Sequence, residues 1–286
     1  MSVWSELPDG CVGTWFDVPS GRLAGLVQGD PSSPRIVLVP GATGSKEDFI
    51  LMLPTLAAAG FRVETFDLAG QYESWGAGPE NLVPPRTRYD YELFVDDLVA
   101  VLEAGSTPVH LLGYSFAGVI ASLVAIRRPE LVASLTLLSS PPEPGQCFRG
   151  MKRVGWVTGL GSERLGATAM IWGIRSNVIR VPEDRLRFVK ERFRLTRRSS
   201  VDNIIGLMRR TPDLRSSLAA IDVPKLVAVG EYDVWPLSLH AEFARDIDAT
   251  LAVYRSGHSP CEESPQDLCR DLQALFRRAE EKPYRR

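Results

Sequence analysis

Hydrophobic residues in this chain gather in short unbroken runs, separated by longer segments with helical spacing. The clearest runs lie at 35–39, 62–67, 109–112, 132–138, 225–229 and 251–254, and two weaker ones at 12–18 and 22–28. Runs rich in Val, Ile and Leu are typical of strands covered on both faces, as in parallel sheets. Between them, apolar residues recur at helical spacing in 46–59, 90–103, 116–127, 237–246 and 265–278. This alternation predicts an α/β fold whose mostly parallel sheet is flanked by helices.

The alternation is interrupted between the strand predicted at 132–138 and the one predicted at 225–229. The residues between them have the pattern of helices and turns, including an amphipathic helix that begins after Pro182 and runs to Leu195. A loop of this length without secondary structure is uncommon in a compact domain. We therefore interpret 142–222 as an inserted helical cap. Residues 1–141 and 223–286 then form the two parts of the α/β core.

Composition and charge narrow the function classes. The chain has 286 residues, of which 44% are hydrophobic and 24% charged, and its net charge is −2. These values are ordinary for a globular protein and do not fit a basic nucleic-acid-binding protein. No apolar run approaches the roughly 18 residues that a membrane-spanning helix needs. We therefore expect neither a nucleic-acid partner nor a membrane span.

The charge is unevenly distributed between the two predicted regions. Residues 143–222 carry a net charge of +8, and the remainder of the chain carries −10. One interpretation is a solvated, arginine-rich helical surface. The other is that the basic cap attracts an anionic substrate or partner.

The cysteines and the N-terminal segment both favour a cytoplasmic protein. The first positive side chain, Arg22, comes after Glu6 and Asp9, which does not fit a secretory signal. No two cysteines form a CxxC pair, so in a chain of this length we expect free thiols in a reducing cytosol and no structural zinc. The four cysteines are Cys11, Cys147, Cys261 and Cys269.

One serine lies where a predicted strand becomes a predicted helix. The sequence there is Gly113-Tyr-Ser115-Phe-Ala117. A sharp strand-to-helix turn needs small residues two positions before and after the serine, and it leaves the hydroxyl exposed above the sheet. The free N–H groups at the start of the helix can stabilise an oxyanion. This context makes Ser115 the candidate nucleophile.

A serine nucleophile needs a base, and the chain offers three histidines. His110 lies within a predicted strand, where a buried or capping role is expected. His240 lies within a helical pattern, and we expect it at the surface. His258 follows the last predicted strand, in a loop at the same edge of the sheet as Ser115. Because such sheets bind ligands beyond the carboxyl ends of their strands, His258 is the candidate base.

The acid that orients the histidine should also follow a strand. Asp233 lies just past the strand predicted at 225–229, and Glu231 is the near alternative. The preceding strand is followed by Ser139-Ser140-Pro141, which supplies no carboxylate. Asp233 is therefore the candidate acid, and the order serine, acid, histidine is that of the α/β hydrolases.

Four motifs in order give the chain a resemblance to a known family. They are Val39-Pro-Gly41-Ala42, Asp67-Leu-Ala-Gly70-Gln, the segment Gly113–Gly118, and Gly257-His258 followed by Glu263 and Pro265. Across residues 20–278 the chain resembles α/β-hydrolase-fold proteins, specifically the cap-bearing esterase type. It departs from the family pattern at Pro40, where many members have histidine, at Ala117, where glycine is commoner, and at Gln71-Tyr72, which replaces His-Gly.

The resemblance implies a mechanism and a set of site residues. Ser115, His258 and Asp233 would form a catalytic triad, and the backbone N–H groups of Phe116 and Ala42 would form the oxyanion hole. No metal or organic cofactor is implied. Aromatic and Met side chains of the cap are expected to line an apolar substrate pocket, as such sites are usually lined. The candidates are Trp156, Met170, Trp172, Phe188 and Met208.

Three functions remain open on these grounds. The first is a serine hydrolase that cleaves a carboxylic ester of a small molecule through an acyl-enzyme. The second is a thioesterase or specialised-metabolism hydrolase, whose anionic partner, a carrier protein or coenzyme A, docks on the basic cap. The third is a non-hydrolytic lyase or ligand-binding protein on the same fold. The sequence carries no indication of oligomeric state.

Overall fold

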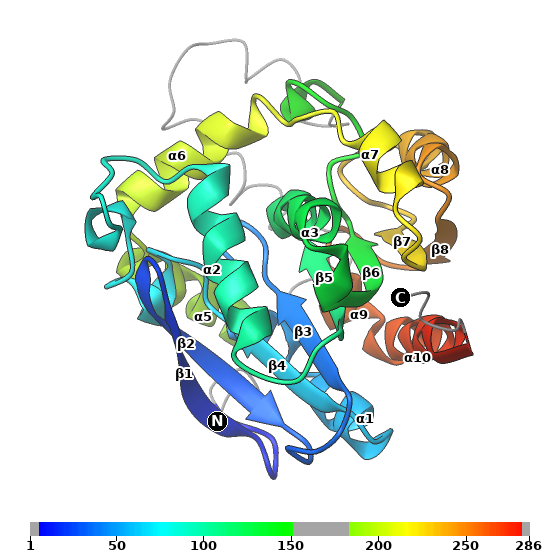
Figure 1. Ribbon diagram of the computed structural model, residues 1–286, viewed down its shortest axis with the longest axis horizontal. Helices are drawn as coiled ribbons and strands as arrows, with labels where there is room; N and C mark the ends of the chain where they lie inside the picture. Colours follow the sequence, from blue (N-terminus) through cyan, green and yellow to red (C-terminus); the bar gives the residue numbers. More distant parts are fainter. Residues whose placement is uncertain (1–5, 151–182, 282–286) are drawn as a thin grey trace.

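The computed structural model describes residues 6–150 and 183–281, and its centre is one eight-stranded sheet (Figure 1). The strand order is β1-β2-β4-β3-β5-β6-β7-β8. The strands from β4 to β8 pair in parallel, whereas β2 pairs antiparallel with both β1 and β4. The mostly parallel sheet expected from the sequence is therefore confirmed. Its strands are β1 (Val12–Val18), β2 (Gly21–Gln28), β3 (Arg35–Val39), β4 (Arg62–Phe66), β5 (Val109–Tyr114), β6 (Val132–Leu138), β7 (Lys225–Gly230) and β8 (Thr250–Tyr254).

Helices cover both faces of the sheet and enclose two hydrophobic cores (Figure 1). One core holds buried side chains of α2 (Tyr91–Glu103), α3 (Phe116–Arg127) and α8 (Leu237–Asp246). The other holds those of α1 (Leu53–Ala58), α9 (Pro260–Glu263) and α10 (Pro265–Glu281). Every residue of β3, β5 and β7 is buried, as expected for strands between two helical layers.

The helix predicted over 46–59 is divided in the structure. A short 3₁₀ helix, η1 (Lys46–Phe49), comes first, and α1 begins only at Leu53. Pro54 occupies the first turn of α1. Proline has no N–H to continue a helix from the preceding turn, but it is tolerated in the first turn of a new one. The division therefore follows from the chemistry of one residue.

Between β6 and β7, the described residues form helices and turns, as the sequence indicates. These elements are η5 (Cys147–Gly150), α5 (Glu183–Leu195), α6 (Arg198–Met208) and α7 (Arg215–Ala220). The two ends of this region meet, since Gly145 and Thr211 exchange backbone hydrogen bonds of 2.7 and 3.0 Å. The division of the chain into a core and a cap at 142 and 222 stays a prediction.

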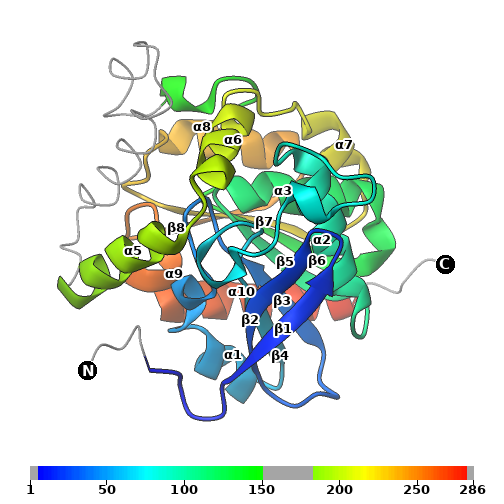
Figure 2. The ribbon, with the colours of Figure 1, turned by 90° about the vertical axis from the view of Figure 1, so that its left-hand side faces the viewer.

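The remaining short 3₁₀ helices lie in the connections between strands and helices. They are η2 (Tyr72–Ser74), η3 (Pro79–Asn81) and η4 (Pro129–Leu131). Figure 2 shows α5 beside α9, although the two helices are far apart in the sequence. Helix α9 begins directly after the loop that carries His258, so α5 lies close to that loop.

Candidate active site

Ser115 lies at the turn between β5 and α3 in a backbone conformation that few residues adopt. Its φ is 53° and its ψ is −120°, an unusual combination for a residue with a side chain. A Cβ on Gly113 would lie 2.4 Å from the carbonyl oxygen of Ala117, and one on Gly118 would lie 2.3 Å from Ser140 Oγ. Both glycines are therefore needed for α3 to pack this closely, and the tight turn has the form expected of a nucleophile elbow.

Two contacts of hydrogen-bond length connect Ser115, His258 and Asp233. His258 Nε2 lies 3.2 Å from Ser115 Oγ, and His258 Nδ1 lies 3.1 Å from Asp233 Oδ2. The three residues come from the loops after β5, β8 and β7. The structure therefore brings together the three side chains that the sequence singles out, in an arrangement able to pass a proton from hydroxyl to imidazole.

The loops after β7 and β8 are joined by their backbones. Glu231 N–H donates to the carbonyl of Tyr254 at 2.7 Å, and Tyr232 N–H donates to the carbonyl of Ser256 at 3.0 Å. Gly230 makes this approach possible, because a Cβ there would lie 1.9 Å from the carbonyl oxygen of Gly257. The alternative acid, Glu231, is exposed, whereas Asp233 is buried beside His258.

The environment of Asp233 favours the ionised carboxylate. Burial alone would raise its pKa, but the neighbouring imidazoles of His258 and His240 outweigh burial and hold the pKa of Asp233 well below its usual range. The backbone N–H of Trp235 also donates to Asp233 Oδ1 at 3.0 Å. An ionised acid in this place can orient the imidazole and stabilise it when it is protonated.

The ring of His258 is held between aromatic side chains. Its centroid lies 5.5 Å from that of Tyr114 and 5.6 Å from that of Trp235. The Tyr114 hydroxyl and Ser259 Oγ are 2.8 Å apart, which ties the end of β5 to the histidine loop. The two loops that carry Ser115 and His258 are thus connected by more than the contact between those residues.

The candidate oxyanion hole lies between the loop after β3 and the start of α3. Gly41 packs so closely on the elbow that a Cβ there would lie 3.1 Å from Ser115 Cβ. Among the hydrogen bonds of residues 6–150 and 183–281, none uses the backbone N–H of Ala42 or of Phe116. Two free donors beside the nucleophile are what a developing oxyanion requires. Their role stays a prediction.

Ion pairs of the buried Lys46 join the loop after β3 to the turn after β4. Lys46 Nζ lies 3.0 Å from Asp67 Oδ2 and 2.6 Å from Glu73 Oε2. Burial would lower the pKa of Lys46, but the nearby carboxylates of Asp67 and Glu47 outweigh it and raise that pKa. The Lys46 ammonium therefore stays charged and holds the Asp-x-x-Gly turn against this loop.

The predictions for the other two histidines, His110 and His240, differ in how well they match the structure. His110 is buried in β5, with Nδ1 2.9 Å from Ser134 Oγ, so the expectation of a buried residue is confirmed. The expectation that His240 lies at the surface is wrong, because its side chain is fully buried beside Asp233. His240 sits three and four residues before the buried Phe243 and Ala244 of α8. This spacing is the sequence signal that could have placed it inside.

The predicted pocket residues are only partly within the described chain. Trp156, Met170 and Trp172 lie outside the described residues. Phe188 on α5 packs edge-on against Tyr72, with ring centroids 5.8 Å apart, and Met208 is buried in the core that contains α2 and α3. A substrate-lining role for any of the five stays a prediction.

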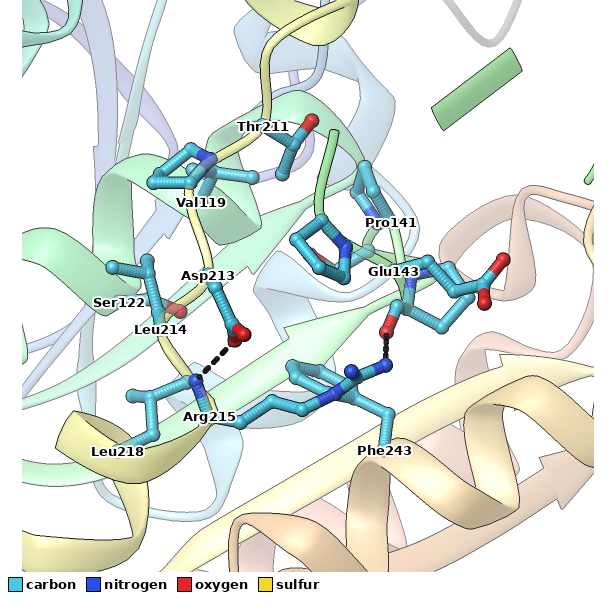
Figure 3. Close-up of a pocket in the computed structure, with 14 residues that line it drawn as sticks. Val119, Ser122, Pro141, Glu143, Thr211, Asp213, Leu214, Arg215, Leu218 and Phe243 are labelled. Carbon is cyan, nitrogen blue, oxygen red and sulfur yellow. Dashed lines mark hydrogen bonds between the residues drawn. The ribbon is translucent and has the colours of Figure 1, made fainter. Parts of the chain in front are cut away.

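A separate small cleft opens beside the exit from β6 (Figure 3). Arg215 lies across it and donates to the carbonyl of Pro142 at 3.0 Å, which connects the two ends of the segment between β6 and β7. The residues that line this cleft do not include Ser115, Asp233 or His258. The cleft is therefore distinct from the candidate active site.

Neither a metal site nor a membrane-spanning helix is found in the described part of the chain. No group of three or more His, Cys, Asp or Glu side chains within it could hold a metal ion. None of its helices combines the length and apolar character needed to cross a bilayer. Within the same residues, all four cysteines are buried and unpaired.

A comparison with known protein families matches most of the chain. The family described as "Alpha/beta hydrolase family" matches residues 36–272, which include Ser115, Asp233 and His258. The chain belongs to the alpha/beta hydrolase family. Its relatives include hydrolases of several kinds, so membership alone does not fix the reaction of this α/β hydrolase.

Two curated relatives show the range of that family. A Bacillus subtilis (strain 168) protein with the provisional name 2-succinyl-6-hydroxy-2,4-cyclohexadiene-1-carboxylate synthase is 26% identical, over 86% of this α/β hydrolase and 91% of that protein. The sn-1-specific diacylglycerol lipase ABHD11 of Mus musculus is 31% identical over 41% of this chain, and the match spans only 36% of the mouse protein.

Solved structures agree on the fold of this α/β hydrolase. An esterase from Exiguobacterium antarcticum superposes with a TM-score of 0.71 at 23% identity, covering 93% of this chain and all of that one (100%). At this identity the likeness concerns the fold and not the reaction.

Proposed function

We propose that this α/β hydrolase is a serine hydrolase that cleaves a carboxylic ester of a small molecule. The observation that carries the proposal is the pair of contacts that joins Ser115 Oγ to His258 at 3.2 Å and His258 to Asp233 at 3.1 Å. These distances suit proton transfer from the hydroxyl to the imidazole and orientation of the imidazole by the acid. The buried, ionised Asp233 supports the same roles.

The proposed reaction has two halves. His258 takes the proton of Ser115 as Oγ attacks the ester carbonyl, and the N–H groups of Phe116 and Ala42 bind the oxyanion. Each such donor typically lowers the barrier by roughly 3 kcal/mol. His258 then protonates the leaving alcohol, and a water activated by the same imidazole hydrolyses the acyl-enzyme.

A fluorophosphonate probe tests the nucleophile directly. Wild-type protein should be labelled and should hydrolyse p-nitrophenyl esters, and Ser115→Ala should do neither. Ser122→Ala is the matched control, because Ser122 is a buried serine of α3, the helix that follows Ser115, and donates to the carbonyl of Gly118. Ser122→Ala should be labelled like wild type. Labelling that persists in Ser115→Ala would exclude Ser115 as the nucleophile.

A lyase-type reaction is the second candidate, favoured by the match over nearly the whole length of the Bacillus subtilis synthase. Such a reaction does not require an acyl-enzyme. If the probe labels Ser115 but no ester or thioester in a broad panel is turned over, the result favours the lyase-type reaction over ester hydrolysis. Turnover with an acyl-enzyme burst supports the esterase.

An anionic carrier or coenzyme A partner would need free basic charge on the inserted region. Four of its arginines are instead ion-paired with carboxylates outside this region, namely Arg185, Arg192, Arg197 and Arg215. Part of the +8 charge therefore neutralises carboxylates of the rest of the chain, which weakens this alternative. If kcat/KM on an anionic thioester falls steeply with salt, the carrier alternative is favoured; a flat response favours the simple esterase.

A further inference from the structure

A second imidazole lies against the carboxylate of Asp233, on the side opposite His258. His240 Nε2 is 3.8 Å from Asp233 Oδ1, whereas His258 Nδ1 is 3.1 Å from Oδ2. The side chains of His240 and Asp233 are both fully buried (0% exposed). The acid is thus enclosed between two imidazoles.

His240 carries two polar ring nitrogens into this buried place. Within the described residues, neither its Nδ1 nor its Nε2 makes a hydrogen bond. Buried polar atoms are nearly always paired, so an unpaired ring nitrogen close to a carboxylate needs an explanation. The polar atom beside it is Asp233 Oδ1, which lies 3.8 Å from His240 Nε2. At this separation in a buried place the imidazole and the carboxylate interact electrostatically without a hydrogen bond.

Trp235 already orients the carboxylate of Asp233, so the effect expected of His240 is on the charge of that carboxylate and not on its orientation. Its backbone N–H donates to Asp233 Oδ1 at 3.0 Å, so the carboxylate is oriented even without His240. Its indole packs edge-on against both imidazoles, with centroids 6.2 Å from His240 and 5.6 Å from His258. What His240 adds is an imidazole whose N–H group can face Oδ1 and draw negative charge away from Oδ2.

We propose that His240 lowers the pH at which His258 becomes available as a base, by sharing the charge of Asp233. This inference rests on the proposed function and deepens it. A carboxylate that is shared between two imidazoles stabilises the protonated form of either one less than a carboxylate devoted to it. His258 then stays neutral, and able to accept the proton of Ser115, to lower pH. His240 acts through Asp233 and is a positioning residue.

The elements packed against α8 determine which charges lie near His240. Helix α8 packs against α7, β7 and β8. Asp233, in the loop after β7, is the titratable group that lies beside His240, and His258, in the loop after β8, lies on the other oxygen of the same carboxylate. The ion pair between α7 and α8, Arg215–Asp246, lies more than a turn further along α8.

The titration of His258 by NMR tests the proposal without any substrate. The chain has three histidines, so single variants assign every imidazole resonance. In His240→Phe, the titration midpoint of His258 should rise by roughly half a pH unit or more, because Asp233 then acts on His258 alone. His240→Gln keeps an N–H donor and should restore most of the wild-type midpoint.

The matched control is His110→Phe, which removes another buried histidine that contacts Ser134 and not Asp233. It should leave the His258 midpoint unchanged. If His240→Phe does not fold, His240→Leu is read in the same way. An unchanged midpoint in a folded apolar variant would overturn the proposal, because a purely structural role predicts that result.

Hydrolysis is measured separately in the same variants. In an active enzyme, the acid limb of the kcat/KM profile of His240→Phe should move to higher pH with the NMR midpoint. A shifted midpoint in a protein whose Ser115 is neither labelled nor active would reject the proposed function and leave the inference on His240 intact.

Discussion

Arg185 on α5 donates to the buried Asp48 at 2.7 Å and so joins the segment between β6 and β7 to the loop after β3. The same guanidinium contacts Glu262 of α9, directly after the histidine loop. Arg192, two turns along α5, donates to Asp48 and to Ser45 Oγ. Burial would raise the pKa of Asp48, but the charges of Arg192 and Arg185 lower it, so the carboxylate stays ionised. One helix thus holds two loops of the candidate active site.

Loss of Arg192 should therefore affect both stability and catalysis. Arg192→Met removes a buried hydrogen bond to a charged group, so the free energy of unfolding should fall by roughly 2 kcal/mol. The value of kcat should fall more than KM changes, because the loop that carries Ala42 loses its support. Urea unfolding and ester kinetics measure the two effects.

The control for that prediction is Arg198→Met, which breaks an exposed pair with Asp202 at 3.6 Å. An exposed pair of this kind contributes less than about 1 kcal/mol. Similar losses of stability and kcat in the two variants would show that α5 does not hold the loop as described.

Gly113→Ala should displace Ser115, the proposed nucleophile. The added Cβ would lie 2.4 Å from the carbonyl oxygen of Ala117, so α3 must move away from β5 and carry Ser115 with it. Overpacking of this kind costs about 1 to 3 kcal/mol of stability. Misplacement of a reacting atom by about 1 Å can lower the rate by about 100-fold. Ester hydrolysis and the thermal midpoint are the measurements.

Gly13→Ala gives the comparison for Gly113→Ala. A Cβ on Gly13, in the edge strand β1, would meet nothing within 4 Å. Its activity and thermal midpoint should match those of wild type. If Gly113→Ala also behaves like wild type, close packing of α3 on β5 does not position Ser115.

The sequence predicted the strands and the three converging side chains because each rests on a local rule. Ser115, Asp233 and His258 all follow strands, and the carboxyl ends of parallel strands meet at one edge. The prediction that His240 is exposed was wrong because a single polar residue in an amphipathic helix is usually assigned to the exposed face. Its spacing from Phe243 places it on the buried face. The pairing of α5 with Asp48 could not be predicted, since it depends on how two distant segments pack.

A buried ion pair at the start of β3 gives a prediction on stability alone. Arg35 Nη2 lies 2.7 Å from Glu64 Oε2, and the guanidinium also donates to the carbonyls of Val101 and Leu102 at the end of α2. Arg35→Met leaves these acceptors without their donor. The free energy of unfolding should fall by about 3 to 5 kcal/mol. Activity per folded molecule should stay unchanged.

Arg62→Met tests whether burial makes Arg35 important. Arg62 binds the other carboxylate oxygen of Glu64, at 2.6 Å, but its own side chain is 25% exposed. Its loss should cost only about 1 kcal/mol in urea unfolding. Equal losses for Arg35→Met and Arg62→Met would contradict the argument from burial.

Asp97 should make the stability of the fold depend on pH. This buried carboxyl of α2 accepts hydrogen bonds from Ser20 N at 3.0 Å and Ser20 Oγ at 2.6 Å. Burial outweighs these bonds and raises the pKa of Asp97 to about 7. A pKa raised by folding means that the folded state holds a proton that the unfolded state has released. The contribution to stability is therefore present at low pH and is lost as pH rises through about 7.

Asp97→Asn mimics the protonated form and cannot titrate. The thermal midpoint of Asp97→Asn minus that of wild type should therefore increase as the pH is raised from 6 to 8. A gain of about 1 kcal/mol corresponds to about 3 °C in a domain of this size. Asp17→Asn, at a carboxylate that is 89% exposed, is the control for the change in charge and should show no such trend. Other buried carboxyls such as Asp67 are present in both proteins, so their contributions cancel in the difference. A difference between Asp97→Asn and wild type that stays constant over this range would mean that Asp97 remains ionised in the fold.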